Sequence, residues 1–385
     1  MLPLVRGREP IRVASTRVED PEAAVAELFA RLRAPELSGV LIFCSSRYPL
    51  DRLADALATC ADGLAVVGCT SSGEITPDGL DEGTITAVGF PTDGFRLSVA
   101  CFEDLDRFDA DAARQSVRAL VADANEWARG VGARPNHAAI FLVDGLSHRE
   151  EMLTLTLQDA LGEVPLIGGS SGDGLDFRET FVFCDGRFRR DAALVALLSA
   201  ERPMSVFRAQ HYVPGSTKMV ITAADPVARV VHEINAEPAA EEYARLVGAR
   251  VDELGPAVFA AHPPMVRAGG EHYVRSIQTA NPDGSLTFYC AIDEGVVLTL
   301  GEGDDILAGL HGLFERLDRD VGGLDRVLGF DCVLNSVEIG QRQLTGAVSR
   351  LYASHGVVGF NTYGEQFHAL HVNQTFSGLA IGRGC

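Results

Sequence analysis

The sequence predicts an α/β fold of two domains, in which mixed parallel and antiparallel sheets are flanked by helices. A unit of strand, helix, strand and glycine-rich loop occurs three times, and alternating apolar runs follow each copy. The length of 385 residues allows two domains, and a hydrophobic content of 46% is enough for full-sized cores. The repeated unit therefore decides the predicted architecture.

Each unit opens with a short apolar run that ends at a small or polar residue, as a buried strand does at its edge. These runs cover residues 41–45, 141–145 and 332–336. The following helix carries an apolar stripe at i, i+4 and i+7, formed by Leu53/Leu57/Cys60, Leu153/Leu157/Ala160 and Leu344/Val348/Leu351. A second strand then ends at Gly68, Gly168 or Gly359. This order favours a parallel strand pair with a right-handed crossover.

Further strands are expected over residues 84–90, 95–102, 180–184, 192–198 and 371–382, which should pair antiparallel and make the sheets mixed. Between the second and third units we expect strands over 205–222, 273–279, 286–292 and 296–300, and helices over 226–246 and 304–317. Turn residues near 215–225 predict a domain boundary. Residues 1–220 would then form an N-terminal domain with two units, and residues 221–385 a C-terminal domain with the third.

Charge and hydropathy narrow the function classes. The formal net charge is −20, from 53 acidic and 33 basic residues, which disfavours binding to nucleic acid or anionic lipid. No apolar run approaches the roughly 18 to 20 residues that span a bilayer, and the N-terminus shows no signal peptide. We expect a cytoplasmic protein without a membrane span or a nucleic-acid partner.

The eight cysteines are scattered without any C-x-x-C pair, and most of them lie in apolar runs. This spacing is typical of neither a zinc site nor a disulfide framework. We expect most of the cysteines to be reduced, buried side chains.

The glycine-rich loops, residues 68–74, 168–174 and 359–365, form the predicted ligand site. Ligands of open α/β sheets bind at the carboxyl ends of the strands, where glycines let the backbone approach closely. Neither a Walker loop nor a dinucleotide fingerprint occurs at these positions. A purely structural role of the glycines, in tight turns, stays open. The candidate ligand-binding residues in the loops are Gly68, Cys69, Gly168, Ser170, Asp173, Tyr363 and Glu365.

An enzyme would use Cys69 or Ser170 as its nucleophile. The sequence designates no base for either side chain, although His148 lies on the neighbouring strand-to-helix loop. We therefore expect a protein without catalysis, and a hydrolase is the alternative from another function class.

Six motifs stand out as a set: V-V-G-C-T-S-S-G-E at 66–74, F-L-V-D-G-L-S at 141–147, I-G-G-S-S-G-D-G at 167–174, Y-V-R-S-I at 273–277, G-F-N-T-Y-G-E-Q at 359–366 and H-V-N-Q-T-F at 371–376. Together they resemble the FIST family of sensory domains, over nearly the whole chain. The resemblance implies a ligand-binding sensor with an N-terminal and a C-terminal FIST domain. Chains of this length resemble the haem-binding nitric-oxide sensors of the family, which act on a partner histidine kinase or a cyclic-di-GMP enzyme.

Haem, which this resemblance implies, needs an apolar slot and an axial ligand that is usually a neutral histidine. His371 is the first candidate, because it follows the third glycine loop and would share a strand face with Asn373. Its rivals are His262, held by the two prolines that follow it, and His232, on the helix expected from residue 226.

The resemblance also allows an amino acid or a similar small metabolite as the ligand. Arg275, inside an expected strand, would bind a carboxylate of either ligand, unless a surplus acidic side chain neutralises it. Asp144 and Asp173 could hold an α-ammonium group, for which haem has no use. We expect haem, and through it nitric oxide, as the leading ligand and an amino acid as the alternative. Either would bind in a cleft between the glycine loops and the C-terminal strand.

Overall fold

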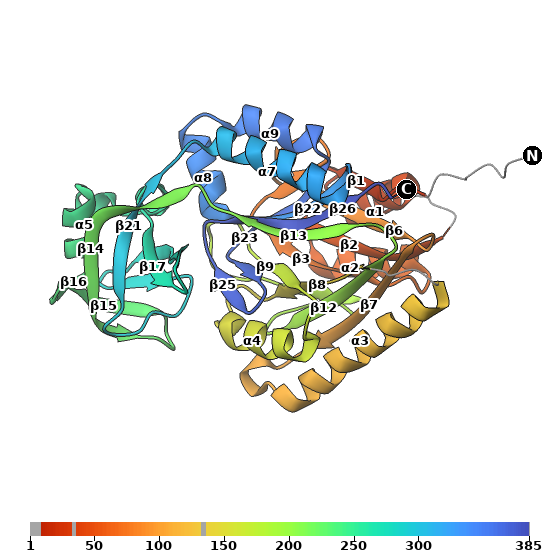
Figure 1. The fold of residues 1–385 in the computed structure, drawn as a ribbon, viewed down its shortest axis with the longest axis horizontal. Coiled ribbons are helices and arrows are strands. Elements are labelled where there is room, and N and C mark those ends of the chain that lie inside the picture. The colour runs from red at the N-terminus through yellow and green to blue at the C-terminus, as the bar shows by residue number, and fades with distance from the viewer. Residues whose placement is uncertain (1–8, 33–35, 132–135, 385) are drawn as a thin grey trace, which may run out of the picture.

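The computed structural model describes residues 9–32, 36–131 and 136–384. It consists of a helix-covered body and a smaller β-rich lobe, which lies at the left of Figure 1. Three six-stranded sheets form the body, and an eight-stranded sheet forms the lobe, here named the β-domain (residues 212–303). The expected α/β class, with mixed sheets flanked by helices, is confirmed.

The three body sheets share one strand arrangement, in which two antiparallel strands lead to a parallel pair and a short hairpin follows. The first sheet runs β1 (Arg12–Thr16), β6 (Ile85–Pro91), β2 (Leu37–Ser45), β3 (Val66–Ser71), β10 (Val182–Cys184), β11 (Arg187–Arg189). The second runs β7 (Phe95–Phe102), β12 (Ala193–Ala200), β8 (Asn136–Val143), β9 (Leu166–Ser170), β24 (Glu365–Phe367), β25 (Leu370–Val372). The third runs β13 (Met204–Ala209), β26 (Phe376–Gly382), β22 (Leu324–Cys332), β23 (Val357–Thr362), β4 (Glu74–Thr76), β5 (Gly79–Asp81).

The hairpin that completes each sheet comes from a different unit. Strands β10 and β11 follow β9 in the chain but extend the sheet at β3, and β24 and β25 follow β23 but extend it at β9. Strands β4 and β5 follow β3 but extend the third sheet at β23. The exchange is cyclic, so every unit gives one hairpin and receives one. Each hairpin also covers the open edge of a parallel pair.

Helices cover the outer faces of the body sheets, whereas the inner faces pack against one another (Figure 1). The helices are α1 (Pro21–Leu32) and α2 (Leu50–Ala61) on the first sheet, α3 (Ala110–Val131) and α4 (Glu150–Leu161) on the second, and α7 (Ile306–Val321), α8 (Val333–Gln341) and α9 (Thr345–Ser354) on the third. The inner core takes side chains from all three sheets, among them Phe43, Leu142 and Phe330. Within the described ranges, no helix is both long and apolar enough to cross a bilayer.

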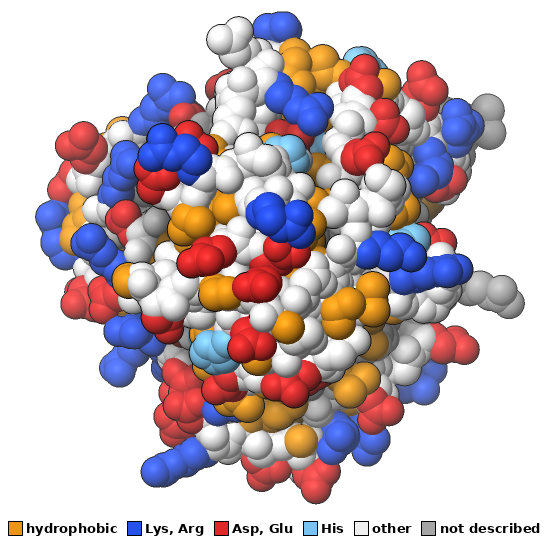
Figure 2. Space-filling view, turned by 90° about the vertical axis from the view of Figure 1, so that its left-hand side faces the viewer, with side chains coloured by type: hydrophobic (Ala, Val, Ile, Leu, Met, Phe, Trp, Pro, Cys, Tyr) orange, Lys and Arg blue, Asp and Glu red, His pale blue; other side chains and the backbone are white. Residues whose placement is uncertain are grey.

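The β-domain is inserted into the third unit, between β13 and α7. Its strands run β18 (Glu271–Val274), β17 (Pro264–Ala268), β21 (Val297–Gly303), β14 (Tyr212–Asp225), β15 (Val230–Ile234), β20 (Leu286–Phe288), β19 (Ile277–Ala280), with β16 (Glu237–Pro238) beside β15. Helices α5 (Ala239–Val247) and α6 (Pro256–Ala261) pack on its core. Figure 2 shows this end of the molecule, where hydrophobic side chains lie in small groups between charged side chains of both signs. The boundary expected at residue 220 lies inside β14.

Two expectations for this lobe are wrong. The helix expected over 226–246 begins only at Ala239, because residues 230–234 form a strand that ends in a tight turn. Asn235 and Ala236 have φ values of 56° and 64°, which a right-handed helix does not allow. The strand expected over 273–279 is broken at Arg275 and Ser276, because β18 pairs with β17 whereas β19 pairs with β20.

The third copy departs from the gapless repeat. Its parallel strand ends at Cys332, and residues 333–341 form α8, so the strand expected over 332–336 is wrong. A short apolar run fits a buried helical turn as well as a strand. Helix α9 then carries the expected apolar stripe. Helix α8 lines two separate cavities of the protein.

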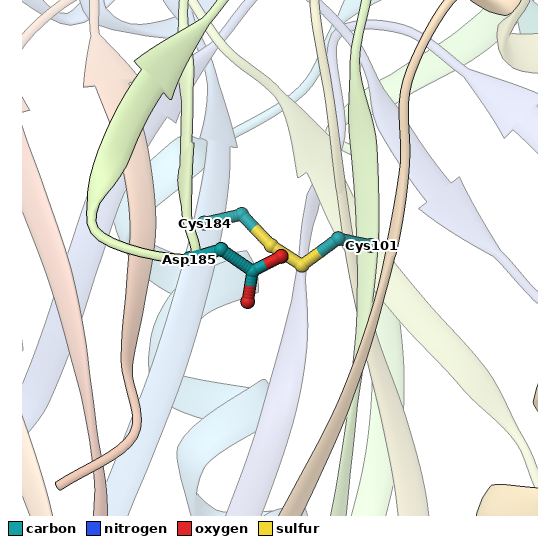
Figure 3. Close-up of side chains that lie close together, drawn as sticks. All are labelled: Cys101, Cys184 and Asp185. Carbon is teal, nitrogen blue, oxygen red and sulfur yellow. A yellow bond between two sulfur atoms is a disulfide. The ribbon is translucent and has the colours of Figure 1, made fainter. Parts of the chain in front are cut away.

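Cys101 in β7 and Cys184 in β10 form a disulfide that joins the first two sheets (Figure 3). The expectation of reduced cysteines is wrong for this pair, since a sequence separation of 83 residues gives no sign of the contact. Asp185 lies beside the disulfide, but bonded sulfurs offer a metal no thiolate. The free cysteines are Cys44, Cys69, Cys290 and Cys332, which are buried, and Cys60; Cys385 lies outside the described residues.

Gly68, Gly168 and Gly359 occupy equivalent positions in the three parallel pairs. A Cβ atom added at any of them would overlap the carbonyl oxygen of the residue opposite on the neighbouring strand. Glycine is therefore required here by the close approach of two backbones. The repeated glycine has a structural reason that is independent of any ligand.

Replacing Gly168 with alanine should lower the free energy of unfolding by at least about 2 kcal/mol, because the neighbouring strand must move to avoid the new methyl group. Gly312→Ala in α7 is the control: a Cβ there meets nothing within 4 Å, and alanine favours a helix interior by roughly 0.5 to 1 kcal/mol. Urea unfolding of both variants measures the difference. Equal stability of Gly168→Ala and the wild type would contradict the close approach.

Candidate functional site

The three glycine loops meet where the hairpins cross between sheets. The amide of Ser72 donates to the carbonyl of Asn361 (2.9 Å), and that of Gly172 donates to Thr70 (3.1 Å). The amide of Ser170 donates to the carbonyl of Gly364 (2.8 Å). The loops are therefore close together, as expected, but they contact each other directly, and the space for a ligand lies to one side.

That space is a polar cavity of about 360 Å³ between the first loop, the second loop and the start of α8. Serine and glycine backbone, acidic side chains and one arginine form most of its wall. Its lining residues are Ser45, Ser46, Arg47, Ser71, Ser72, Gly73, Glu74, Glu82, Gly83, Asp173, Gly174, Leu175, Asp176, Val333, Ser336 and Val337. All three units thus contribute to one cavity, and Asp173 alone among the sequence-predicted residues lines it.

Glu74 is the most buried acidic side chain of the cavity lining and has no exposed surface. Its carboxylate accepts hydrogen bonds from the Ser71 hydroxyl and from the amide (2.9 Å) and hydroxyl (2.8 Å) of Thr84. Burial raises the pKa of Glu74 to about 7, although these donors act in the opposite direction. The group therefore changes charge near neutral pH.

Glu365 in the third loop repeats the same cage. Its carboxylate accepts from the Thr362 hydroxyl and from the amide (3.2 Å) and hydroxyl (2.7 Å) of Thr375. Burial raises the pKa of Glu365 to about 8. The same set of hydroxyl and amide donors surrounds Glu74 and Glu365, and Glu365 does not line the cavity. The main role of the Glu365 carboxylate is therefore to hold the third glycine loop in place.

The rim of the cavity carries polar groups that are available to a ligand. Arg47 is exposed and forms no ion pair with any described residue. Glu82 and Asp176 are exposed acids on the rim, and the buried hydroxyl oxygen of Ser72 lacks a hydrogen-bond partner. Val333 and Ser336 place the first turn of α8, which has no side-chain cap, at the wall. One cation, two acids and a free hydroxyl therefore converge here.

Asp173 and Asp144 are satisfied by the protein itself. Asp173 accepts from the amides of Phe177 (2.9 Å), Arg178 (2.8 Å) and Glu179 (2.9 Å) and from the Tyr363 hydroxyl. Asp144 accepts from two backbone amides and the Thr180 hydroxyl, and burial raises its pKa. Asp173 thus fixes the loop that forms one cavity wall, and neither acid is left to hold an ammonium group.

At the second unit, the β-domain packs against the start of α4. Arg229 of the β-domain is 3% exposed and pairs with Glu150 and Glu151 (2.6 Å each) at the start of α4. Ser170 is fully buried beside Glu150, and its hydroxyl accepts from Gln366 (3.0 Å). Loss of one partner of such a buried ion pair would leave the other charge buried and unpaired, which strongly destabilises the fold.

The two suggested nucleophiles lack the features of an active site. Cys69 is fully buried in the inner core, and burial raises the pKa of its thiol well above the ordinary range. A protonated, enclosed thiol is a poor nucleophile. Ser170 contacts a carboxylate and an amide rather than an imidazole. Among the described residues, His148 forms no hydrogen bond with Cys69 or with Ser170.

The three histidines proposed for iron lie on separate elements, in β25 (His371), after α6 (His262) and in β15 (His232). His371 is buried, its Nδ1 lies 3.2 Å from Gln366 Nε2, and its Nε2 lies 3.4 Å from the carbonyl of Tyr289. His232 and His262 are exposed. None of the three lines the polar cavity. None of these three histidines could therefore ligate haem iron from the wall of the polar cavity.

Arg275 and Asn373 belong to the contact between the β-domain and the C-terminal strand. The guanidinium of Arg275 donates to the carbonyl of His371 (3.0 Å), and Asn373 accepts from the amide of Ser276 (3.4 Å). Arg47, Ser72 and Glu82, which the sequence did not single out, line the cavity together with Asp173. The signal that could have found Arg47 is its place on the loop after the first parallel strand, at the carboxyl edge of the sheet.

Comparison with known proteins adds two family matches. Residues 39–237 match the FIST N domain, and residues 239–368 match the FIST C domain. No curated protein matches the chain. Among solved structures, the chain is similar to a crystal structure of chorismatase, with 12% identity, a TM-score of 0.36, and coverage of 98% of this chain and 100% of that one. A similarity this weak carries no argument about function.

The raised pKa of Glu74 predicts how stability depends on pH. The folded state holds the proton up to about pH 7, whereas the ordinary value is 4.5, so the free energy of unfolding should fall as the pH rises between these values. Glu74→Gln removes this titration. The stability of the variant relative to the wild type should rise by about 3 kcal/mol across this range.

Urea unfolding between pH 4.5 and 8 measures this difference, with Glu126→Gln at an exposed position of α3 as the matched control. If the two variants show the same pH dependence, the Glu74 carboxyl ionises as easily in the folded as in the unfolded chain.

Proposed function

The chain belongs to the FIST family of sensory ligand-binding domains, with a FIST N domain before a FIST C domain, and on this premise we propose that it binds an amino acid or a similar small zwitterion. The observation that carries the proposal is the polar cavity of about 360 Å³ in which Arg47, Glu82, Asp176 and Ser72 converge. A guanidinium suits a carboxylate, and exposed acids suit an ammonium group.

The position of the cavity supports a sensory role. Its walls come from all three units, so a bound molecule contacts parts of the chain that are far apart in sequence. Helix α8 links the cavity to the β-domain, because Ser336 and Val337 line the wall and the next residue, Glu338, accepts from the Tyr212 hydroxyl. A ligand that binds one arrangement of these parts more tightly shifts the population towards it. A partner histidine kinase or cyclic-di-GMP enzyme that responds to this shift stays a prediction from the family resemblance.

Amino acids should raise the thermal unfolding midpoint of the wild type, and isothermal titration of the strongest one should give a saturable isotherm. Arg47→Ala should weaken that affinity about ten-fold or more, because a charge-assisted hydrogen bond is worth roughly 1.5 to 3 kcal/mol. Arg118→Ala, an exposed arginine on α3 away from the cavity, should bind like the wild type. The proposal is wrong if no amino acid binds, or if both variants bind equally well.

Haem stays a prediction from the family resemblance, and the described histidines lead us to expect a negative result. Protein mixed with hemin should give the absorption spectrum of free hemin, since His371 is enclosed by Gln366 and Tyr289. A sharp Soret band that moves on reduction and on addition of nitric oxide would instead support haem sensing. Loss of that band in His371→Ala would then identify the axial ligand.

A further inference from the structure

A second, smaller cavity of about 60 Å³ lies between α7, α8, α9 and the segment that leads into the β-domain. It is separate from the polar cavity described above. Its polar wall consists of Asp331 at the end of β22, Asn335 on α8 and Tyr352 on α9, with His211 beside them. Its apolar wall includes Ile306, Leu310, Ile339 and Phe376.

Asp331 is a buried carboxylate without a cation. It is 1% exposed, accepts from the amide of Asn335 (2.9 Å) and from the hydroxyl of Tyr352 (3.0 Å), and forms no ion pair with any arginine or lysine in the described chain. Burial raises the pKa of Asp331 to about 6, and the two hydrogen bonds act in the opposite direction. A buried charge of this kind normally has a partner of opposite charge.

Asn335 adds a second unsatisfied acceptor. It is 4% exposed and uses its NH₂ group for Asp331, whereas its carbonyl oxygen has no hydrogen-bond partner. The orientation of this amide is fixed, because a flipped amide would point its oxygen at the carboxylate. The polar wall therefore has unused capacity to accept hydrogen bonds.

His211 forms no ion pair or hydrogen bond with Asp331, although its charge acts to lower the pKa of Asp331. His211 Nε2 lies 2.6 Å from Glu338, and Glu338 also pairs with Arg342 (2.6 Å) and accepts from Tyr212. None of these contacts involves the Asp331 carboxylate. On α7, the residues that face the cavity are Ile306, Gly309 and Leu310, which carry no charge.

The chemistry of the walls selects the class of ligand. An anion would meet the Asp331 carboxylate, and Mg²⁺ or Ca²⁺ would find too few oxygen ligands among apolar side chains. A primary ammonium ion can donate to the carboxylate and to the free amide oxygen, while its alkyl group contacts Leu310 and Phe376. The rings of Tyr352 and Phe376, which stack at 5.0 Å, form part of the wall around this alkyl group.

We propose that this cavity is a binding site for a small primary alkylammonium ion, held by Asp331 and the carbonyl oxygen of Asn335. The volume of about 60 Å³ limits the alkyl group to one or two carbons. The site is independent of the zwitterion site proposed above, since the two cavities share no lining residue.

Isothermal titration with methylammonium chloride, against sodium chloride at equal ionic strength, tests the proposal on the full chain. The wild type should bind methylammonium in a saturable way and show no such isotherm with sodium. Asp331→Asn should bind at least about ten-fold more weakly, because the charge-assisted hydrogen bond is lost. A cavity that holds only water would give no saturable binding and would overturn the proposal.

A variant of α7 tests the same cavity without changing Asp331, so the test does not depend on the folding of Asp331→Asn. Gly309 is an exposed residue at the cavity wall, and a Cβ there meets nothing within 4 Å, so Gly309→Leu should fold and place its side chain at the mouth of the cavity. Gly312→Leu, on the same helix and equally open, is the matched control and should bind like the wild type. Methylammonium binding that survives in Gly309→Leu would overturn the assignment to this cavity.

Discussion

The cyclic exchange of hairpins between three sheets constrains the rest of the body. Each parallel pair would have an open edge, and the hairpin of another unit closes it, so no unit can complete its sheet alone. The exchange forces three loops to cross at one place, where they hydrogen-bond to each other. Gly68, Gly168 and Gly359 are required because the neighbouring strands approach so closely that a Cβ atom would overlap a carbonyl oxygen. These glycines would be needed even without a ligand.

Three similar units nevertheless give three different environments at the carboxyl ends of their strands. The first keeps a polar cavity, the second is closed by Arg229 and Tyr289 of the β-domain, and the third gains α8. The inserted lobe and the additional helix break the symmetry that the repeated strands establish. The molecule can therefore have a single polar cavity, lined by all three units, although its units are similar.

Buried carboxylates occur repeatedly at the ends of these strands. The number of hydrogen-bond donors around each carboxylate indicates its role. Glu74, Glu365 and Asp144 are enclosed by hydroxyl and amide donors, which hold loops in fixed positions. Asp331 has only two donors and a neighbouring amide oxygen without a partner. The number of donors, rather than burial alone, distinguishes a structural acid from one that can receive a ligand.

The sequence by itself determined the repeated strand, helix and glycine loop, because apolar periodicity and close backbone contact are local properties of each copy. It also indicated that the glycine loops lie near one another. Only the tertiary structure decided which unit supplies each hairpin, that Cys101 meets Cys184, and that residues 333–341 are helical. These features depend on contacts between residues far apart in the chain. For the same reason Asn335 became a candidate ligand contact only once α8, α9 and the inserted lobe were packed together, whereas the position of Arg47 after a parallel strand could have been noticed in the sequence.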